Sequence, residues 1–269
     1  MLFRALHAIL LGTALACVAF GTAAAQEVLL PRAYEQTSVG IVYDRELSFP
    51  VTLHTNGFEL GVHWGRLRSY YKTRYWSLGV GHVKHPAEIK QSSGGSPSGS
   101  FRQGAASFVY GKQRNLYPVR LARGFRRYYS GKDRRRGVAV GLDYELGGLL
   151  GVSKAYTLQA SQTGDNVSNP DRFISYDERP SLFVDRGRIE GAGGLRRGWS
   201  EARFHPGVTA KLGVHLDWGA FDEFMRAIEV GVLVDAYASS VPLLVDEADA
   251  RNTPLFVNFY ATLQLGRRR

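Results

Sequence analysis

The sequence has almost no cysteine. Its one cysteine, Cys17, lies in an apolar N-terminal stretch. Residues 1–4 are short and basic, residues 5–22 carry no charge, and three alanines follow at 23–25, which is the order of a cleaved secretory signal peptide. A retained anchor or lipoprotein processing at Cys17 fits less well, because the apolar run is barely long enough to span a membrane and continues past the cysteine. We therefore predict that residues 1–25 are removed and that the mature chain, 26–269, has no disulfide or cysteine metal site.

Long apolar runs and catalytic motifs are also lacking. After residue 26 no uncharged stretch is long enough to predict a transmembrane helix. The serine elbow of hydrolases, the P-loop, His-Glu-x-x-His and Cys-x-x-Cys do not occur. We therefore predict no cofactor and no metal. The net charge of +10 would suit nucleic acid in a cytosolic protein, but export points to anionic lipid headgroups and lipopolysaccharide phosphates instead.

Alternating apolar and polar residues are the main feature that is present. Val208, Leu212 and Trp218 fall on one face of a strand, and Lys211 and Asp217 fall on the other. The same period of two recurs near 39–54, 58–65, 138–146, 228–235 and 255–265. Several of these runs extend to about ten residues or more, whereas strands in soluble proteins average about five or six residues. The pattern favours an all-β, antiparallel transmembrane β-barrel over its main alternative, a soluble β-sandwich.

The spacing of these runs predicts about ten strands, in a range of 8–12, within a single barrel domain over 26–269. We expect strands near 37–54, 58–67, 70–84, 103–112, 117–128, 136–147, 151–160, 205–218, 224–238 and 254–266. The connections at 85–102, 129–135, 161–204 and 239–253 are expected to be long extracellular loops, because short and long connections alternate in such barrels. Asn56-Gly57 predicts a tight hairpin turn. Apolar residues between 173 and 184 indicate that the 161–204 loop forms a partly ordered cap or plug.

Several short runs resemble those of uncharacterised outer-membrane β-barrel proteins of Bacteroidota-like bacteria. They are His-Thr-Asn-Gly-Phe at 54–58, Tyr-Lys-Thr-Arg at 71–74, Lys-His-Pro-Ala-Glu at 84–88, Tyr-Gly-Lys-Gln at 110–113, the stretch 147–154 and Phe-His-Pro-Gly at 204–207. The Lys84, His85, Pro86 and Glu88 run is the most specific. The resemblance implies an outer-membrane barrel and brings no activity. The chain departs from many such barrels because it ends in Arg269 rather than in an aromatic residue.

The polar faces of the strands place charged groups of both signs inside the barrel. In a narrow barrel these groups are expected to pair and fill the lumen. The predicted lumen residues are Asp44, Glu46, His63, Lys112, Asp143, Glu145, Lys211, His215, Asp217, Glu229 and Asp235. A narrow channel for small solutes would use similar residues and remains the second alternative.

An enzyme related to lipid A acyl hydrolases is the first alternative. Such an enzyme needs a histidine base, a hydroxyl nucleophile and a carboxylate near the outer leaflet, for which His54, Thr55 and Glu59 are the candidates. The Thr-Asn-Gly run is nevertheless explained by the turn alone.

A basic hairpin between residues 124 and 136 gives a candidate contact with lipopolysaccharide phosphates, and a solvated charged turn explains it equally well. Its residues are Arg126, Arg127, Lys132, Arg134, Arg135 and Arg136.

Taken together, these features of the sequence predict an exported outer-membrane barrel with a structural or interaction role. Its expected partners are membrane lipid, lipopolysaccharide and the barrel assembly machinery.

Overall fold

The computed structural model describes residues 43–69, 71–91, 107–130, 137–160, 173–185, 189–194, 196–219, 222–245 and 252–269. The predicted signal peptide and the first residues of the predicted mature chain lie outside these ranges. Among the helices of the described residues, none has the length and apolar character needed to cross a membrane.

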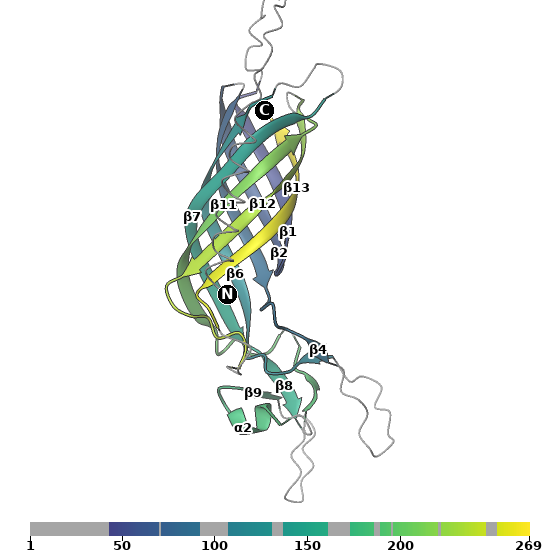
Figure 1. Cartoon of the computed structure of the whole chain (residues 1–269), viewed down its shortest axis with the longest axis vertical. Coiled ribbons are helices and arrows are strands. Elements are labelled where there is room, and N and C mark those ends of the chain that lie inside the picture. The colour runs from purple at the N-terminus through teal and green to yellow at the C-terminus, as the bar shows by residue number, and fades with distance from the viewer. Residues whose placement is uncertain are drawn as a thin grey trace, which may run out of the picture. The chain divides into compact units, whose positions relative to one another are not determined.

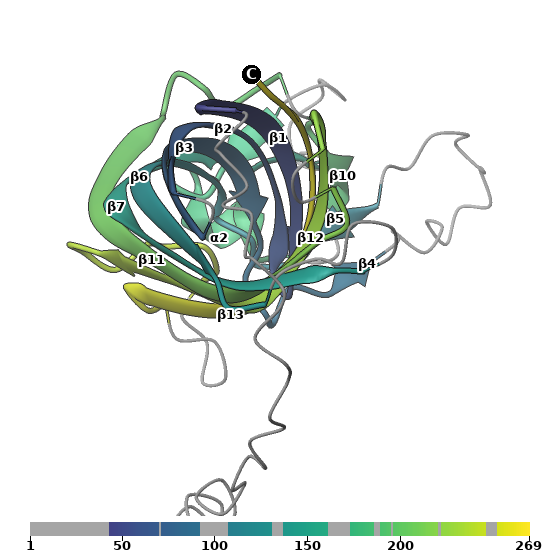
Figure 2. The same ribbon diagram turned by 90° about the horizontal axis from the view of Figure 1, so that it is seen from above.

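Eight antiparallel strands close into a barrel (Figures 1 and 2). Around the barrel they follow the order β1-β13-β12-β11-β7-β6-β3-β2, and pairing of β1 with β13 closes the ring. Closure leaves no unpaired sheet edge among these strands. The strands are β1 (Arg45–His54), β2 (Gly57–Ser69), β3 (Lys72–Val83), β6 (Arg114–Tyr128), β7 (Ala139–Ala155), β11 (Arg203–Asp217), β12 (Phe224–Tyr237) and β13 (Leu255–Arg268).

The strand count of about ten is too high, although eight lies within the predicted range. The expected strands at 136–147 and 151–160 imply a short connection at 148–150, but β7 runs straight through it. Gly147 serves close packing there, because a Cβ at this position would overlap the carbonyl of Leu121 on β6. The expected strand at 103–112 contributes only β5 (Phe108–Val109), which pairs outside the barrel with β4 (Lys90–Gln91).

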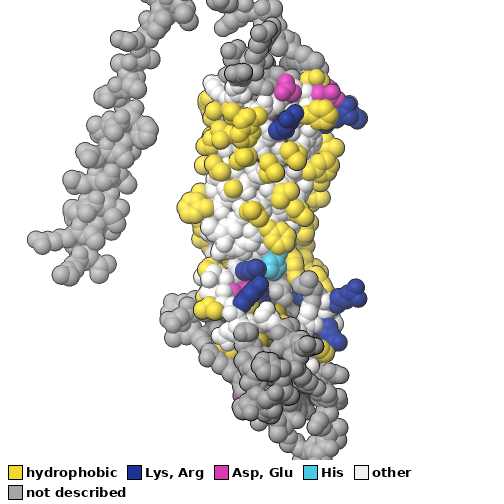
Figure 3. Space-filling view, turned by 90° about the vertical axis from the view of Figure 1, so that its right-hand side faces the viewer, with side chains coloured by type: hydrophobic (Ala, Val, Ile, Leu, Met, Phe, Trp, Pro, Cys, Tyr) yellow, Lys and Arg dark blue, Asp and Glu magenta, His cyan; other side chains and the backbone are white. Residues whose placement is uncertain are grey.

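The two faces of the barrel wall have opposite character. Along β1 the outward side chains of Leu47, Phe49 and Leu53 are 46%, 55% and 65% exposed, whereas Ser48 and Thr52 between them are buried. The other barrel strands follow the same rule, and apolar side chains cover the middle of the outer surface in Figure 3. The barrel therefore carries its apolar residues outside and its polar residues inside.

The connections differ between the two ends of the barrel. At the end that holds the C-terminus, strands are joined by residues 70–71, 129–138 and 218–223. This end is called the terminal end below. At the opposite end, called the cap end, the connections are the tight turn at 55–56 and the long segments 84–113, 156–202 and 238–254. The predicted placement of 129–135 among the loops of the opposite end is therefore wrong, because the expected strand at 103–112 is not part of the barrel and one strand fewer before this hairpin changes the side on which it emerges.

The long connections build a small folded cap (Figure 1). It contains the sheet β10-β8-β9, the pair β4-β5 and one helical turn, α2 (Pro180–Phe183). The sheet strands are β8 (Thr157–Ala160), β9 (Phe173–Ser175) and β10 (Ile189–Ala192). The apolar core of the cap consists of Phe108, Leu158, Ala160, Ile174, Phe183 and Ile189. The prediction of ordered structure in this segment agrees with this core.

A second apolar cluster lies at the cap end of the barrel strands. Val241 and Leu243, from the connection between β12 and β13, are buried together with Val83, Leu116 and Tyr237. The side chain of Asn252 accepts hydrogen bonds from the backbone amides of residues 243 and 244 at 2.8 and 3.1 Å. This connection is thereby held against the ends of the strands, where its apolar side chains pack among residues of β3, β6 and β12.

Candidate functional site in the barrel lumen

Arg126 is the centre of the ion-pair network in the terminal half of the lumen. Its guanidinium group donates to Asp143 and to Glu46, each at 2.9 Å, and to the Gln264 amide oxygen at 3.1 Å. Arg268 also donates to Glu46, at 3.0 Å, and to Asp217, at 2.6 Å. All of these side chains are buried. Because a buried pair that loses one partner leaves an uncompensated charge, such a network costs about 3–5 kcal/mol to break.

Tyr75 connects this network to the acidic groups on β7. Its hydroxyl donates to Asp143 and lies 3.0 Å from Glu145. The ring stacks on His63, with centroids 4.8 Å apart, and lies under the Arg126 guanidinium at 5.2 Å. Tyr75 can occupy this place because the facing residue on β6 is Gly124, where a Cβ would overlap the tyrosine ring.

A second ion-pair network fills the half of the lumen nearer the cap. Arg120 pairs with Glu59 and with Asp235. Lys211 donates to the other oxygen of Glu59 at 2.7 Å, and Thr209 donates to Asp235 at 2.7 Å. Four strands, β2, β6, β11 and β12, contribute to these contacts, so the charges cross-link the barrel from within.

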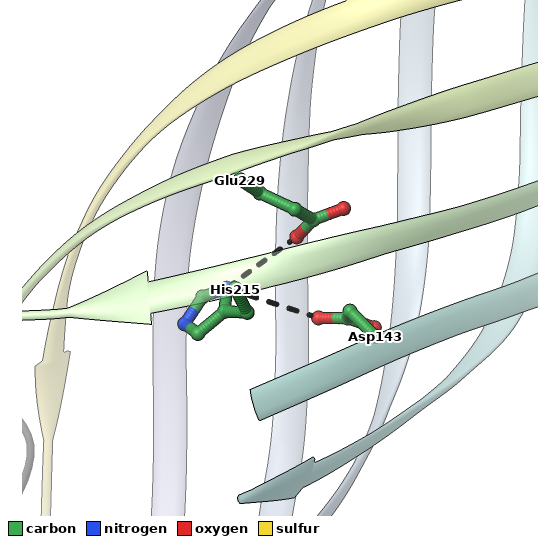
Figure 4. Close-up of side chains that lie close together, drawn as sticks. All are labelled: Asp143, His215 and Glu229. Carbon is green, nitrogen blue, oxygen red and sulfur yellow. Dashed lines mark hydrogen bonds and ion pairs between the residues drawn. The ribbon is translucent and has the colours of Figure 1, made fainter. Parts of the chain in front are cut away.

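Asp143, His215 and Glu229 form the group most like a metal site among the described residues (Figure 4). One ligand-type atom from each lies within 4.8 Å of the others. The Nδ1 atom of His215 is 3.4 Å from Glu229 and 4.0 Å from Asp143. However, the Asp143 oxygen that faces His215 already accepts the hydrogen bond from Arg126. A metal ion would have to lie beside this guanidinium group, so the residues fit an ion-pair network better than a metal centre.

Nine of the eleven predicted lumen residues lie inside the barrel as buried side chains: Glu46, His63, Asp143, Glu145, Lys211, His215, Asp217, Glu229 and Asp235. The other two lie elsewhere. Asp44 precedes β1 and its side chain is 76% exposed, and Lys112 lies beyond β5 in the cap. Arg120 and Arg268 were not predicted as lumen residues, and Arg126 was predicted at the surface, because β6 carries arginines on both of its faces and its sequence shows no clear alternation.

The three candidate catalytic residues do not form a nucleophile–base pair. Both ring nitrogens of His54 are buried without a hydrogen-bond partner, and the hydroxyl of Thr55 donates to Asn258 at 3.1 Å. Glu59 belongs to the ion pairs with Arg120 and Lys211.

A histidine–hydroxyl pair that no sequence motif indicates lies on β7 and β11. Ser153 Oγ lies 3.0 Å from the Nε2 atom of His205, near the cap end of the barrel. Ser153 is completely buried, and the charged groups that act on His205 are Arg114 and Arg203 rather than a carboxylate. This pair therefore lacks both access and the third member of a triad.

The described residues of the predicted lipopolysaccharide contact lie on opposite sides of the barrel wall. Arg126 points inward and is buried, so its prediction as a surface contact is wrong. Alternation along β6 explains this, because neighbouring residues of a strand face opposite sides. Arg127 faces outward beside the ring of Tyr129, at 5.3 Å. Lys132, Arg134, Arg135 and Arg136 lie outside the described residues.

The Lys84–His85–Pro86 run directly follows β3, and its backbone holds the carboxylate of Glu88. The Glu88 carboxylate accepts a hydrogen bond from the His85 amide at 3.0 Å and pairs with Lys112 at 2.7 Å. Burial lowers the pKa of Lys112, and the Glu88 carboxylate opposes this shift. The run therefore has a structural role at the junction of barrel and cap.

Comparison with known proteins adds only a weak likeness. No protein-family model matches the sequence, and no curated protein matches it. A solved structure that matches is the N-terminal β-barrel domain of Pseudomonas aeruginosa OprF, at 8% sequence identity and a TM-score of 0.32, over 84% of this chain and 98% of that chain. The resemblance to the Bacteroidota-like barrel proteins therefore stays a prediction.

Replacing Gly124 tests whether Tyr75 depends on the space that this glycine leaves. We expect Gly124→Ala to displace the ring from Asp143 and Glu145 and to lower the free energy of unfolding by about 1–3 kcal/mol. Gly148→Ala is the matched control on β7, because a Cβ there meets no atom within 4 Å. Urea unfolding in detergent, followed by tryptophan fluorescence, measures both. Equal midpoints for the two variants would contradict the role given to Gly124.

Proposed function

We propose that this protein is an integral outer-membrane β-barrel that neither conducts nor catalyses, and that it anchors a folded cap at the cell surface. The observation that carries the proposal is the reversed polarity of the barrel wall. A closed sheet with an apolar exterior and an ionic interior suits a lipid environment, in which every backbone group must be satisfied within the barrel. In water the same exterior would be a large exposed apolar surface.

The arrangement of connections supports an orientation. Outer-membrane barrels have short turns on the periplasmic side and longer loops outside. On this pattern the terminal end faces the periplasm and the cap faces outward. The cap has its own apolar core and leaves a pocket of about 440 Å³ at its junction with the barrel, lined by Arg114, Asp177, Glu178, Glu201, Ala202 and Arg203. A surface-exposed, folded cap with such a pocket suits an interaction role.

The filled lumen argues against a channel. Ion pairs centred on Arg120 and Arg126 occupy the lumen, and the apolar cluster with Val241 and Leu243 lies at its cap end. Eight-stranded barrels have interiors that side chains fill, whereas aqueous channels belong to larger barrels. Neither histidine–hydroxyl candidate supports the enzyme alternative, because the ring nitrogens of His54 have no hydrogen-bond partner and Ser153, beside His205, is completely buried.

A lysine in the middle of the outer belt tests the lipid environment. Val230 lies midway along β12, opposite Val214 and Ala261, and its side chain is 44% exposed. We expect Val230→Lys to lower the free energy of unfolding in phospholipid vesicles by about 2–4 kcal/mol, the cost of a lysine at the bilayer midplane.

The matched control for this substitution is Val140→Lys, near the terminal end of β7. Val140 is 39% exposed, and a lysine near the membrane interface costs only about 0–1 kcal/mol. Urea unfolding of both variants in the same vesicles gives the comparison. Equal small costs at the two positions would show that the belt does not lie in hydrocarbon.

Conductance measurements separate the anchor from the channel alternative. We expect the purified full-length protein, inserted into planar bilayers, to give no stable single-channel steps, because ion pairs and the apolar cluster block the lumen. Reproducible steps in the unmodified protein would overturn this part of the proposal. Steps that persist in Glu88→Gln, which lacks the ion pair with Lys112, would show in addition that the conductance does not depend on this contact of the cap.

A further inference from the structure

The outer surface of the barrel at its terminal end carries a dense group of cations. They project outward from six neighbouring strands, β12, β13, β1, β2, β3 and β6, beyond the apolar belt. Lys and Arg side chains are visible near the upper end of the barrel in Figure 3. We name the group the terminal basic cluster, and it consists of Arg45, Arg66, Arg68, Lys72, Arg74, Arg123, Arg127, Arg226, Arg267 and Arg269.

Strand register places several of these cations directly opposite one another. Arg45 is opposite Arg66, and Arg66 is in turn opposite Arg74, which makes a row of three arginines across β1, β2 and β3. Lys72 is opposite Arg127 on the next pair of strands. Like charges in directly opposed positions destabilise a sheet unless an anion lies between them.

Few carboxylates balance the terminal basic cluster. Outside the barrel at this end, the described acidic residues are Asp44, Asp222 and Glu223. Among the ion pairs of the described residues, Arg45 pairs with Asp44 at 3.8 Å, and Arg267 pairs with Glu223. The cluster therefore keeps a strong positive excess toward its surroundings.

Aromatic rings fix the depth of the cluster. Arg74 lies over Phe125 at 5.6 Å, Arg123 over Trp76 at 4.9 Å, and Arg267 over Phe224 at 5.8 Å. Trp76 and Phe224 are exposed on the outer face. Tryptophan and tyrosine are enriched at the level of the lipid headgroups, and Trp76 is such a residue. The guanidinium groups above them are therefore held at the height at which lipid phosphates lie.

We propose that the terminal basic cluster binds the phosphate groups of anionic phospholipids. This inference rests on the proposed function, because it requires the barrel to span a membrane. The row Arg45–Arg66–Arg74 is the strongest part of the site, since planar guanidinium groups bind phosphate oxygens in pairs and a phosphate placed among them relieves their mutual repulsion. The headgroups would thereby hold the barrel at a fixed depth and orientation.

Tryptophan quenching by brominated lipids measures this binding. The full-length protein is placed in vesicles of equal parts phosphatidylglycerol and phosphatidylcholine, with bromine on one lipid or the other. Of the four tryptophans, Trp64, Trp76 and Trp218 lie at the terminal end, so quenching reports on the lipid there. We expect phosphatidylglycerol to be preferred about fivefold or more at low salt, and the preference to disappear in 1 M NaCl.

Two charge-removal variants make the test specific. We expect R45Q/R66Q/R74Q to lose the preference, whereas K84Q/K90Q/R196Q, which removes three exposed cations from the cap end, keeps it. Equal quenching by both lipids in the unmodified protein, or an unchanged preference in the first variant, would overturn the inference. Displacement of phosphatidylglycerol by lipopolysaccharide at equal phosphate concentration would assign the site to lipopolysaccharide and overturn it as well.

The failure of this inference can be told apart from failure of the proposed function. An unboiled gel of the same samples reports whether the compact barrel has formed. A compact barrel without lipid preference contradicts only the phosphate site, whereas absence of a compact barrel in vesicles contradicts the membrane proposal. If the triple variant does not fold, R66Q alone is used, because Arg66 is the middle member of the row.

Discussion

Closure of the eight-stranded sheet by β1 and β13 is the constraint on which the rest of the molecule depends. Once the sheet is closed, each strand has one face toward a narrow interior and one toward the surroundings, and the period of two must be kept without slips. A shift of one residue would move Glu46 outward and Leu47 inward, and would do the same along the entire strand. The alternation seen in the sequence is therefore a direct consequence of closure.

The narrow interior also explains why the lumen is ionic and yet closed. Side chains from all sides of an eight-stranded barrel reach one another, so arginines can pair with carboxylates on distant strands. Arg126 on β6 reaches Glu46 on β1 and Asp143 on β7, and Arg120 reaches Asp235 on β12. The contacts with Glu46 and Asp235 connect strands that are not hydrogen-bonded neighbours, and all of these ion pairs leave the outer face free to be apolar.

Sequence reasoning predicted the barrel and much of the lumen because both follow from local alternation. Asp143, Lys211 and Glu229 could be assigned to the interior from their immediate neighbours alone. The number of strands was harder to predict, since Gly147-Gly148 resembles a turn, whereas in the structure Gly147 packs closely against β6. Arg126 was assigned to the surface because a basic hairpin has no period of its own, and its carboxylate partners come from β1 and β7. Contacts between distant strands are not visible in one sequence.

The central claim is that this chain forms a closed barrel with its apolar face in a membrane. The most direct measurement is the electrophoretic mobility of the protein from detergent-extracted outer membranes, compared with and without boiling. The account predicts a compact, faster band in the unboiled sample that converts to the full-length position on heating. Recovery of the protein in the soluble periplasmic fraction, with the same mobility in both samples, would contradict it.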